Sequence, residues 1–243
     1  MGGQTVETLN YCVLADFYDA LVKDEEATNQ WVAYTKQRVK GKKILELACG
    51  SGEITLALAD EGYQLDALDL SGEMINRARL KDTANKICYM QGDMLDLSAY
   101  GTYDAILCYC DSINYLHPDQ LDILFSEVSR HLNENGIFLF DMHTPGRLIE
   151  FEEPFIEEGW IDTTAYQWAI ESDSQRVIHH FRFYFADGHV ITETHVQHVF
   201  DLDVITRKLA TFGFGVSVTS DFEEPADHEA EKYFICARKG DIL

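Results

Sequence analysis

The stretch ILELACGSGEIT, residues 44–55, decides the fold class of this chain. An apolar, strand-like run ends directly in two closely spaced glycines, Gly50 and Gly52, and a helical pattern follows at once. Glycine in such a turn allows positive φ and lets a ligand approach the backbone more closely than a Cβ permits. A strand, a glycine-rich turn and a helix in this order set a ligand against the N-terminus of the helix. The stretch therefore predicts a ligand-binding βα unit.

Strand-like and helical segments alternate around this unit up to about residue 150. A helical region is predicted at residues 7–40. Apolar runs predict strands at residues 43–48, 64–70, 86–93, 103–110 and 136–143. Helical patterns occupy residues 53–60, the segment that follows the N-cap Ser71, and residues 118–132. This alternation predicts right-handed βαβ units, and therefore an α/β fold with a doubly wound parallel sheet and helices on both faces.

The pattern changes after residue 150. Three strand-like runs, at residues 158–172, 175–185 and 189–200, predict an antiparallel β insertion with a hairpin turn at ADG, residues 186–188. A helix at residues 201–214 and strands at residues 215–222 and 231–239 then close the chain. We expect a single domain in four parts: an N-terminal helical cover (1–40), a ligand-binding core (41–150), a β insertion or lid (151–200), and a C-terminal helix with closing strands (201–243).

Composition and charge limit the class of protein. The chain has 243 residues, 46% of them hydrophobic, which is enough for one sizeable core. It has no apolar run of about 18 residues and no N-terminal signal pattern, so we expect no membrane association. The six cysteines form no CxxC pair, which favours free thiols in the cytoplasm. We expect a monomer or a homodimer.

The net charge bears on the partners. The chain carries 19 Lys and Arg against 42 Asp and Glu, a formal net charge of −23. Its densest basic segment, residues 36–43, is short and precedes the first predicted strand. A phosphate-rich partner would have to overcome this negative field, so nucleic acid is an unlikely substrate.

Acidic residues stand at the ends of two further predicted strands. Asp69 ends the second strand, where a carboxylate can accept two hydrogen bonds from a ribose diol. Asp93 ends the third, where it can accept from an adenine amino group while the Met94 backbone N–H serves a ring nitrogen. In an open parallel sheet these strand ends meet at one edge. Dinucleotides and S-adenosylmethionine are the two ligand classes that use this arrangement.

Two features weigh against a dinucleotide. The dinucleotide fingerprint places a third glycine at position 55, where this chain has Thr55. Glu46 in the strand and Glu53 at the helix start put carboxylates where a pyrophosphate needs an open helix end. A dehydrogenase is therefore disfavoured.

The segments ELACGSG, LDLS and QGDM resemble the first three cofactor motifs of the class I S-adenosylmethionine-dependent methyltransferases, in particular small bacterial members with a methyltransferase domain of type 25. The resemblance covers about residues 10–143. It implies a Rossmann-like, seven-stranded sheet whose last strand is antiparallel. It also implies S-adenosylmethionine as the cofactor and methyl transfer as the activity.

The resemblance carries over the roles of individual residues. Gly50 and Gly52 would lie beside the methionyl part, Asp69 on the ribose, and Asp93 with Met94 on the adenine. The family's first motif usually has glycine where Ala48 stands, and alanine costs little there if its φ is negative, so we expect binding to survive. The full set expected at the cofactor is Tyr18, Glu46, Ala48, Gly50, Gly52, Asp69, Leu70, Asp93, Met94 and Cys110.

Polar residues that follow the fourth predicted strand are candidates for the acceptor side. In the family this segment faces the transferred methyl group, and here it offers Asp111, Asn114 and Tyr115 as catalytic candidates. The motifs of amino-directed and cytosine-directed nucleic-acid methylation are absent. We expect a small, neutral or cationic acceptor with a nitrogen or oxygen nucleophile. The alternatives are a non-catalytic S-adenosylmethionine-binding module, or methylation of a macromolecule such as tRNA or protein.

Five of the nine histidines lie in the insertion: His179, His180, His189, His195 and His198. A metal site is one interpretation, but His195 and His198 point to opposite faces of a strand, which suits joint ligation poorly. We therefore expect a polar hairpin face and no metal. One histidine, or an aromatic residue among Trp160, Tyr166 and Trp168, could form the roof of the acceptor pocket.

Overall fold

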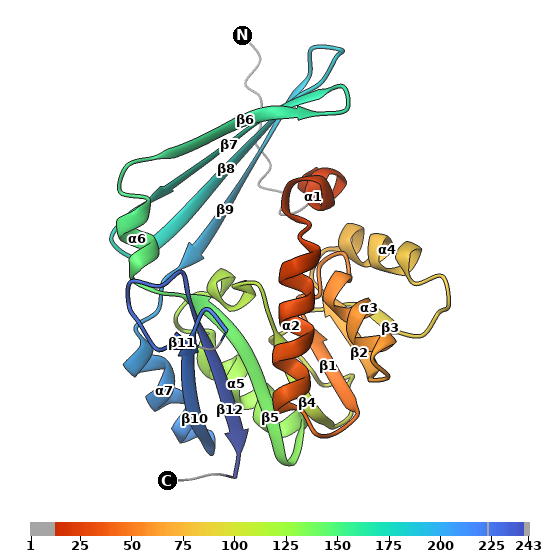
Figure 1. Cartoon of the computed structure of the whole chain (residues 1–243), viewed down its shortest axis with the longest axis vertical. Coiled ribbons are helices and arrows are strands. Elements are labelled where there is room, and N and C mark those ends of the chain that lie inside the picture. The colour runs from red at the N-terminus through yellow and green to blue at the C-terminus, as the bar shows by residue number, and fades with distance from the viewer. Residues whose placement is uncertain (1–12, 223, 241–243) are drawn as a thin grey trace.

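A computed structural model describes residues 13–222 and 224–240 (Figure 1). Its central sheet has eight strands in the order β11-β10-β12-β5-β4-β1-β2-β3. The strands are β1 (Lys43–Leu47), β2 (Gln64–Asp69), β3 (Cys88–Gln91), β4 (Tyr103–Cys108), β5 (Leu132–His143), β10 (Phe214–Ser220), β11 (Glu224–Pro225) and β12 (Lys232–Lys239).

The structure confirms the predicted sheet, including the directions of its strands. Strands β3, β2, β1, β4 and β5 pair in parallel, whereas β12 runs antiparallel to both of its neighbours, β5 and β10. These seven strands form the Rossmann-like arrangement. The two-residue β11, which pairs with the end of β10, is an addition that the sequence pattern did not indicate.

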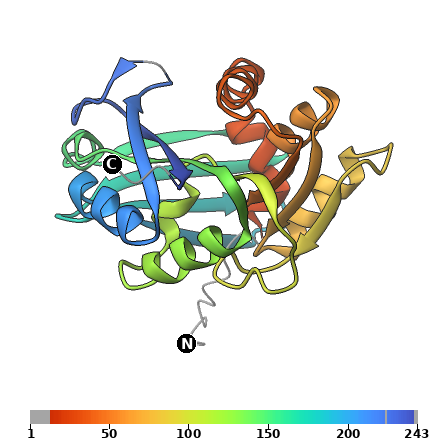
Figure 2. The ribbon, with the colours of Figure 1, turned by 90° about the horizontal axis from the view of Figure 1, so that it is seen from below.

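Helices cover both faces of this sheet. The core cluster on one face joins Trp31 of α2 and Leu58 of α3 to β1 and β4, and the cluster on the other joins Phe125 of α5 and Ile205 of α7 to β5 and β12. Seen from below, α2 lies on the opposite side of the sheet from α5 and α7 (Figure 2). Burial on both faces explains why these strands are almost continuously apolar. The helices are α1 (Leu14–Val22), α2 (Glu25–Arg38), α3 (Glu53–Asp60), α4 (Gly72–Lys81), the 3₁₀ turn η1 (Ser112–Tyr115), α5 (Leu121–His131), α6 (Gly146–Glu150) and α7 (Leu202–Thr211).

The predicted helical region at the N-terminus consists of two helices, α1 and α2. The chain breaks between α1 and α2, because Asp24 is extended and caps α2 by accepting from the backbone N–H groups of Glu26 (2.8 Å) and Ala27 (3.0 Å). The first part of the predicted region, residues 7–12, lies outside the described residues.

The insertion is a four-stranded antiparallel sheet in the order β6-β7-β8-β9. The prediction of three strands was wrong, because the run at 158–172 contains a turn at Asp162, whose φ is +51°, and so splits between β6 and β7. The predicted turn at 186–188 is confirmed. The strands are β6 (Phe155–Ile161), β7 (Thr164–Ser172), β8 (Arg176–Tyr184) and β9 (Val190–His198).

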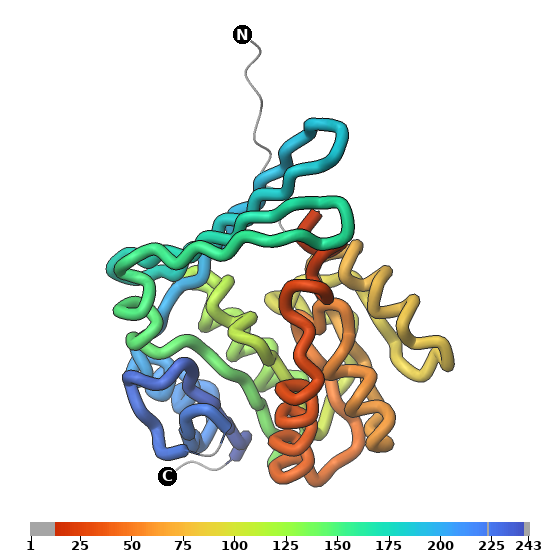
Figure 3. Tube along the Cα trace, turned by 45° about the horizontal axis from the view of Figure 1, so that its top comes forward, coloured from red at the N-terminus to blue at the C-terminus, as the bar shows by residue number. Residues whose placement is uncertain are grey.

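The insertion sheet and α1 lie over the carboxyl ends of the central strands (Figure 3). Leu14 of α1 packs against Phe181 and Phe183 of β8, and Phe17 stacks on Phe183 with ring centroids 4.7 Å apart. Beneath them, the chain leaves β1 toward β2 on one side, while β4 continues to β5 on the other. The loops after β1 and β4 therefore diverge and open a crevice at this edge, the usual ligand position in an open α/β sheet. Over the described residues, no helix has the length and apolarity to cross a membrane.

Candidate active site

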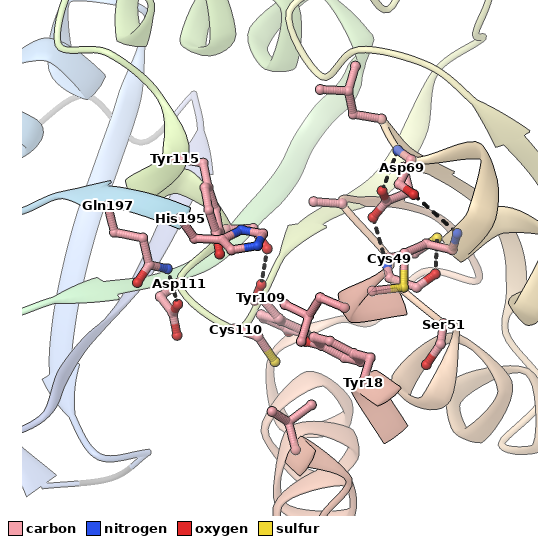
Figure 4. Close-up of a pocket in the computed structure, with 18 of the residues that line it drawn as sticks. Tyr18, Cys49, Ser51, Asp69, Tyr109, Cys110, Asp111, Tyr115, His195 and Gln197 are labelled. Atoms are coloured by element: carbon pink, nitrogen blue, oxygen red, sulfur yellow. Dashed lines mark hydrogen bonds between the residues drawn. The ribbon is translucent and has the colours of Figure 1, made fainter. Parts of the chain in front are cut away.

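A cavity of about 960 Å³ lies between the carboxyl ends of the central strands, α1 and the inner face of the insertion. Asp69 and Ser51 are on one side of it, Asp111, His195 and Gln197 are on the other, and Tyr18 and Cys110 lie between them (Figure 4). Every residue predicted from the sequence lines this cavity except Asn114. Those that do are Tyr18, Glu46, Ala48, Gly50, Gly52, Asp69, Leu70, Asp93, Met94, Cys110, Asp111 and Tyr115.

The loop after β1 is built from left-handed backbone conformations. Ala48 has φ +51°, Gly50 +54° and Gly52 +81°. The condition under which alanine would cost little, a negative φ at Ala48, is therefore not met, because the chain must turn sharply between the end of β1 and the start of α3. A left-handed conformation costs a non-glycine residue about 1–2 kcal/mol. The loop adopts this shape even though alanine stands at its first turn position.

The two glycines of the loop have different physical roles. A Cβ on Gly50 would meet no atom within 4 Å, whereas a Cβ on Gly52 would lie 2.8 Å from the Tyr89 hydroxyl and 2.9 Å from the Ala78 Cβ. Gly50 therefore leaves its backbone open to the cavity. Gly52 instead permits the close packing of the loop on β3 and α4, a role that the sequence did not indicate.

Asp69 bridges this loop to the start of α4. Its Oδ2 accepts from the Gly50 N–H and its Oδ1 from the Ser71 N–H, both at 2.8 Å. Burial raises the pKa of Asp69, and these two backbone donors oppose that shift. A carboxylate has about four acceptor positions, so each oxygen retains capacity for a further donor, such as the hydroxyls of a diol. Asp93, at the next strand end, accepts from the Leu95 N–H at 2.9 Å.

Glu46 supplies a buried acceptor without a partner. Its side chain is 3% exposed, and its Oε2 has no hydrogen-bond partner. Burial raises the pKa of Glu46 to about 7. A buried carboxylate oxygen left unpaired is unfavourable, so a ligand that brings an N–H donor or a positive charge would stabilise it.

α1 is tied to the glycine loop through Asp19. The Ser51 hydroxyl donates to Asp19 at 2.7 Å, and the Lys81 ammonium pairs with Asp19 at 2.6 Å and with Glu53 at 2.6 Å. The helix that bears Tyr18 is thereby held against the loop, so that Tyr18 reaches the middle of the cavity.

Asp111 is part of a partly buried charge cluster on the other side of the cavity, in which the side chains of Asp111 and Lys232 are 20% and 18% exposed and Asp141 is fully buried. Its Oδ1 lies 2.5 Å from the Lys232 ammonium, which is 3.4 Å from the Oδ2 of Asp141. Although burial opposes ionisation, Lys232 and His143 hold the pKa of Asp111 well below its usual range. Burial raises the pKa of Asp141 to about 7. Asp111 therefore stays ionised at neutral pH and is a weak base.

The inner face of the insertion forms the roof of this half of the cavity. Trp168 of β7, His179 of β8, and His195 and Gln197 of β9 line it. Trp160, by contrast, is 74% exposed. Of the residues expected to form the roof, His179, His195 and Trp168 therefore line the cavity, because the alternation of side chains along a strand points them inward. Among the described residues, no cluster of three or more His, Cys, Asp or Glu side chains is placed to hold a metal ion.

Tyr166 and Asn114 lie away from the lining. The Tyr166 hydroxyl donates to Glu157 on the neighbouring strand. Asn114 is fully buried: its Nδ2 donates to the His198 carbonyl at 2.6 Å, and its Oδ1 accepts from the His143 N–H at 3.1 Å. Asn114 thus joins η1 to β9 and β5, and it does not reach the cavity because both ends of its amide are used in these contacts.

Sequence reasoning missed Lys232, Asp141, His143 and Gln197. Lys232, Asp141 and His143 lie on β12 and β5, which pair although they are distant in the sequence. Gln197 lies on β9, whose hairpin with β8 was predicted but whose contact with Asp111 was not. The register places Lys232 opposite His143 across the β5–β12 pair, which no local pattern specifies. The signals available were a lysine near the start of the run at 231–239 and the positions of Asp141 and His143 at the end of the predicted strand 136–143.

Known proteins resemble this chain in sequence and in structure. Residues 44–136 match a family profile described as "Methyltransferase domain". A putative methyltransferase of Bacillus subtilis (strain 168), YqeM, is 33% identical over 246 aligned residues, which cover 96% of this chain and 98% of that protein.

Solved structures share the whole fold. An S-adenosylmethionine-dependent methyltransferase from Clostridium acetobutylicum superposes with a TM-score of 0.81 at 24% identity, covering 95% of this chain and 99% of that chain. The sugar N-methyltransferase KedS8 from Streptoalloteichus gives a TM-score of 0.77 at 21% identity, covering 98% of each chain.

Proposed function

The chain belongs to the class I S-adenosylmethionine-dependent methyltransferases, and on that premise we propose that it methylates a nitrogen or oxygen nucleophile of a small molecule. The single observation that carries the proposal is the two-sided cavity. One side consists of the glycine loop and acids at strand ends, and the other of a charge cluster under a roof from the insertion.

The residues of the first side fit S-adenosylmethionine. Gly50 leaves its backbone open to a ligand, and Glu46 offers an unpaired carboxylate oxygen beside the same loop. Asp69 and Asp93 keep acceptor capacity for a ribose diol and an adenine amino group. When bound, S-adenosylmethionine supplies an electrophilic methyl group on a positively charged sulfonium. The acidic lining, with Asp19 and Glu53 nearby, suits a ligand that carries positive charge.

The second side would align the acceptor. In a methyl transfer, the protein contributes mainly by holding the two reactants in line. Asp111 is suited to accept a hydrogen bond from an N–H or O–H group, because its carboxylate stays ionised. Tyr115 and His195, whose rings meet edge to face at 6.0 Å, would bound the acceptor from η1 and β9. α1 and the insertion sheet together would exclude water from the reacting groups.

The size of the cavity and the charge of the protein support a small acceptor. Ligand pockets commonly measure about 300–1,000 Å³, so this cavity has room for a nucleoside cofactor and a small second molecule. The net charge of −23 disfavours nucleic acid. KedS8 is named a sugar N-methyltransferase, and its similar fold is compatible with an amine acceptor.

A methyl-transfer screen tests the proposal. The purified protein would be incubated with S-adenosylmethionine labelled in the methyl group and with panels of small amines, alcohols, thiols and carboxylic acids, with tRNA and protein extract as parallel panels. Transfer to a small amine or alcohol is expected. Label in tRNA or protein would refute the small-molecule assignment, and S-adenosylmethionine binding without transfer to any panel would indicate a non-catalytic module.

A further inference from the structure

Gln197 lies at the centre of a buried hydrogen-bond network that joins the insertion to Asp111. The residue is on β9 and is 2% exposed. Its amide nitrogen donates to Asp111 Oδ2, and its amide oxygen contacts the Nε2 atoms of His143 at 3.0 Å and His179 at 3.1 Å. The network thus joins β8 and β9 of the insertion to β5 and the loop after β4 in the central part of the chain.

The carboxylate fixes the orientation of the amide. An ionised carboxylate can only accept hydrogen bonds, so the NH₂ group of Gln197 must face Asp111. The amide oxygen of Gln197 then faces both imidazole rings, and an oxygen can only accept. Both rings must therefore donate from Nε2.

A separate contact places the ring proton of His179 on the same nitrogen, Nε2. The indole N–H of Trp168 donates to His179 Nδ1 at 3.2 Å, so Nδ1 must carry a lone pair and the ring proton must reside on Nε2. For His143, Nδ1 is buried and has no hydrogen-bond partner, which is compatible with a lone pair at that atom. Two independent constraints on His179 and one on His143 thus give the same tautomer.

Both rings are neutral at pH 7. Burial lowers the pKa of His179 to about 4; the charge of Asp111 opposes the shift, and His143 and His195 add to it. Burial also lowers the pKa of His143, where Asp111 opposes the shift and Lys232 and Arg147 reinforce it. A neutral ring is what the Trp168 contact requires of His179, and at His143 a neutral ring leaves no unpaired donor at the buried Nδ1.

We propose that Gln197 is a positioning residue for the acceptor: locked by two neutral histidines, it holds the Asp111 carboxylate as a hydrogen-bond acceptor for a molecule that brings an N–H or O–H group. Lys232 holds the other carboxylate oxygen at 2.5 Å, so both oxygens of Asp111 are fixed. Their remaining acceptor positions are available to a donor in the cavity. This inference rests on the proposed function and specifies the chemistry of its acceptor.

The histidine tautomers provide a test that needs neither cofactor nor acceptor. Long-range ¹⁵N–¹H correlation spectra of the histidine-labelled protein should show His143 and His179 as neutral, Nε2-protonated rings between pH 7 and 8. Gln197→Glu, which places a second carboxylate beside both rings, should raise their pKa values by at least about one unit. An Nδ1-protonated His179, an imidazolium at pH 7, or unchanged pKa values in Gln197→Glu would overturn the proposal.

A kinetic test uses the acceptor identified by the transfer screen. Gln197→Met should raise the KM for the acceptor about 10-fold or more, while the Kd for S-adenosylmethionine stays within about twofold, because a hydrogen bond to a charged group is lost on the acceptor side alone. Gln167→Met is the matched control: Gln167 is a glutamine of the same sheet whose amide instead bonds Glu158 at 2.6 Å, and its KM should not change.

The two tests distinguish failure of the positioning role from failure of the proposed function. An unchanged acceptor KM in Gln197→Met would refute the positioning role even though transfer proceeds. Correct tautomers in a protein that methylates no compound would refute the proposed function while the network stands.

Discussion

Single residues on both sides of the cavity occupy left-handed backbone conformations. Ala48 after β1 and both Cys110 and Asp111 after β4 have φ values of +51°, +57° and +51°. Non-glycine residues persist in this region only where surrounding contacts determine the backbone, and such positions cluster at functional sites. Here the two turns border the crevice at the carboxyl ends of β1 and β4.

Ala48→Gly should stabilise the protein. Glycine removes a left-handed penalty of about 1–2 kcal/mol, and the greater freedom of the unfolded chain offsets about 0.4–1 kcal/mol of that gain. The net effect should raise the melting temperature by roughly 1–4 °C, measured by calorimetry. Ala57→Gly in α3 is the control and should lower it, since glycine within a helix costs about 0.5–1 kcal/mol. A melting temperature lowered by both substitutions would contradict the strain at Ala48.

Asp69→Ala should weaken binding of S-adenosylmethionine about 10- to 100-fold. The substitution removes an ionised acceptor for the ribose hydroxyls, and hydrogen bonds to charged groups contribute about 1.5–3 kcal/mol each before water compensates. Isothermal titration calorimetry measures the change, with the exposed Asp60→Ala as the control. If Asp69→Ala binds S-adenosylmethionine as tightly as the wild type does, Asp69 is not the residue that binds the ribose.

At the scale of elements, the glycine loop combines an open face with a packed face. Gly50 borders the cavity, and Gly52 packs against β3 and α4. Both have positive φ, so a substitution at either meets the same kind of backbone penalty. Any difference between them must then arise from what the new Cβ touches.

This pair allows binding to be separated from folding. Gly50→Ala should lose only the stability that a positive φ costs alanine, about 1–2 kcal/mol. It should also lose most of the stabilisation that S-adenosylmethionine provides, because the methyl group enters the ligand's space. Without ligand, Gly52→Ala should melt several degrees below Gly50→Ala, because its Cβ would in addition collide with Tyr89 and Ala78. Thermal melts of both variants, with and without cofactor, measure the contrast. The same loss of stability in both would disprove the division of roles.

α1 is the element that connects the two sides of the cavity. At its N-terminus, the Leu14 N–H donates a hydrogen bond to Glu193 of β9 at 3.0 Å. In its middle, Asp19 accepts a hydrogen bond from Ser51 and forms an ion pair with Lys81. The helix thereby links the insertion to the glycine loop.

Asp19→Ala should loosen α1 without unfolding the core. Loss of the bonds to Ser51 and Lys81 should speed amide exchange across residues 14–22, measured by hydrogen–deuterium exchange mass spectrometry. Asp16→Ala on the same helix is the matched control, because Asp16 pairs with Arg77 at the surface and such pairs contribute little. Equal exchange in the two variants would show that Asp19 does not anchor the helix.

Over the whole molecule, buried acids shape the dependence of stability on pH. Glu46 and Asp141 each have a pKa raised to about 7 in the folded state, primarily by burial. In the unfolded chain such groups lose their protons near pH 4. Between about pH 4.5 and 8 the folded state therefore holds protons that the unfolded state has released, so these groups make stability fall as pH rises, and their effect on the slope fades above about pH 8.

Glu46→Gln should flatten this decline. Glutamine is not ionisable, so the variant lacks the contribution of Glu46 and should lose less stability than the wild type between pH 5 and 7. Urea unfolding at pH 5, 6, 7 and 8 measures the free energy of unfolding. The exposed Glu61→Gln should follow the wild-type curve. Parallel curves for wild type and Glu46→Gln would show that Glu46 is ionised in the folded protein at pH 5.

The sequence by itself determined the central sheet, the glycine loop and the order of acids at the strand ends. These features depend on local periodicity and on short turns such as Gly50-Ser51-Gly52. Both involve only a few neighbouring residues, so they can be recognised from the sequence alone. Local patterns also revealed the insertion, although the turn at Asp162 within one apolar run was not recognised.

Only the tertiary structure decided the positive φ of Ala48, the packing role of Gly52 and the acceptor side of the cavity. Asp111 acquires its partners Lys232, from β12, and Gln197, from β9, because strand pairing and the placement of the insertion bring distant segments together. The register of such pairings is fixed by the burial of whole sheets, a property that no short stretch of sequence contains.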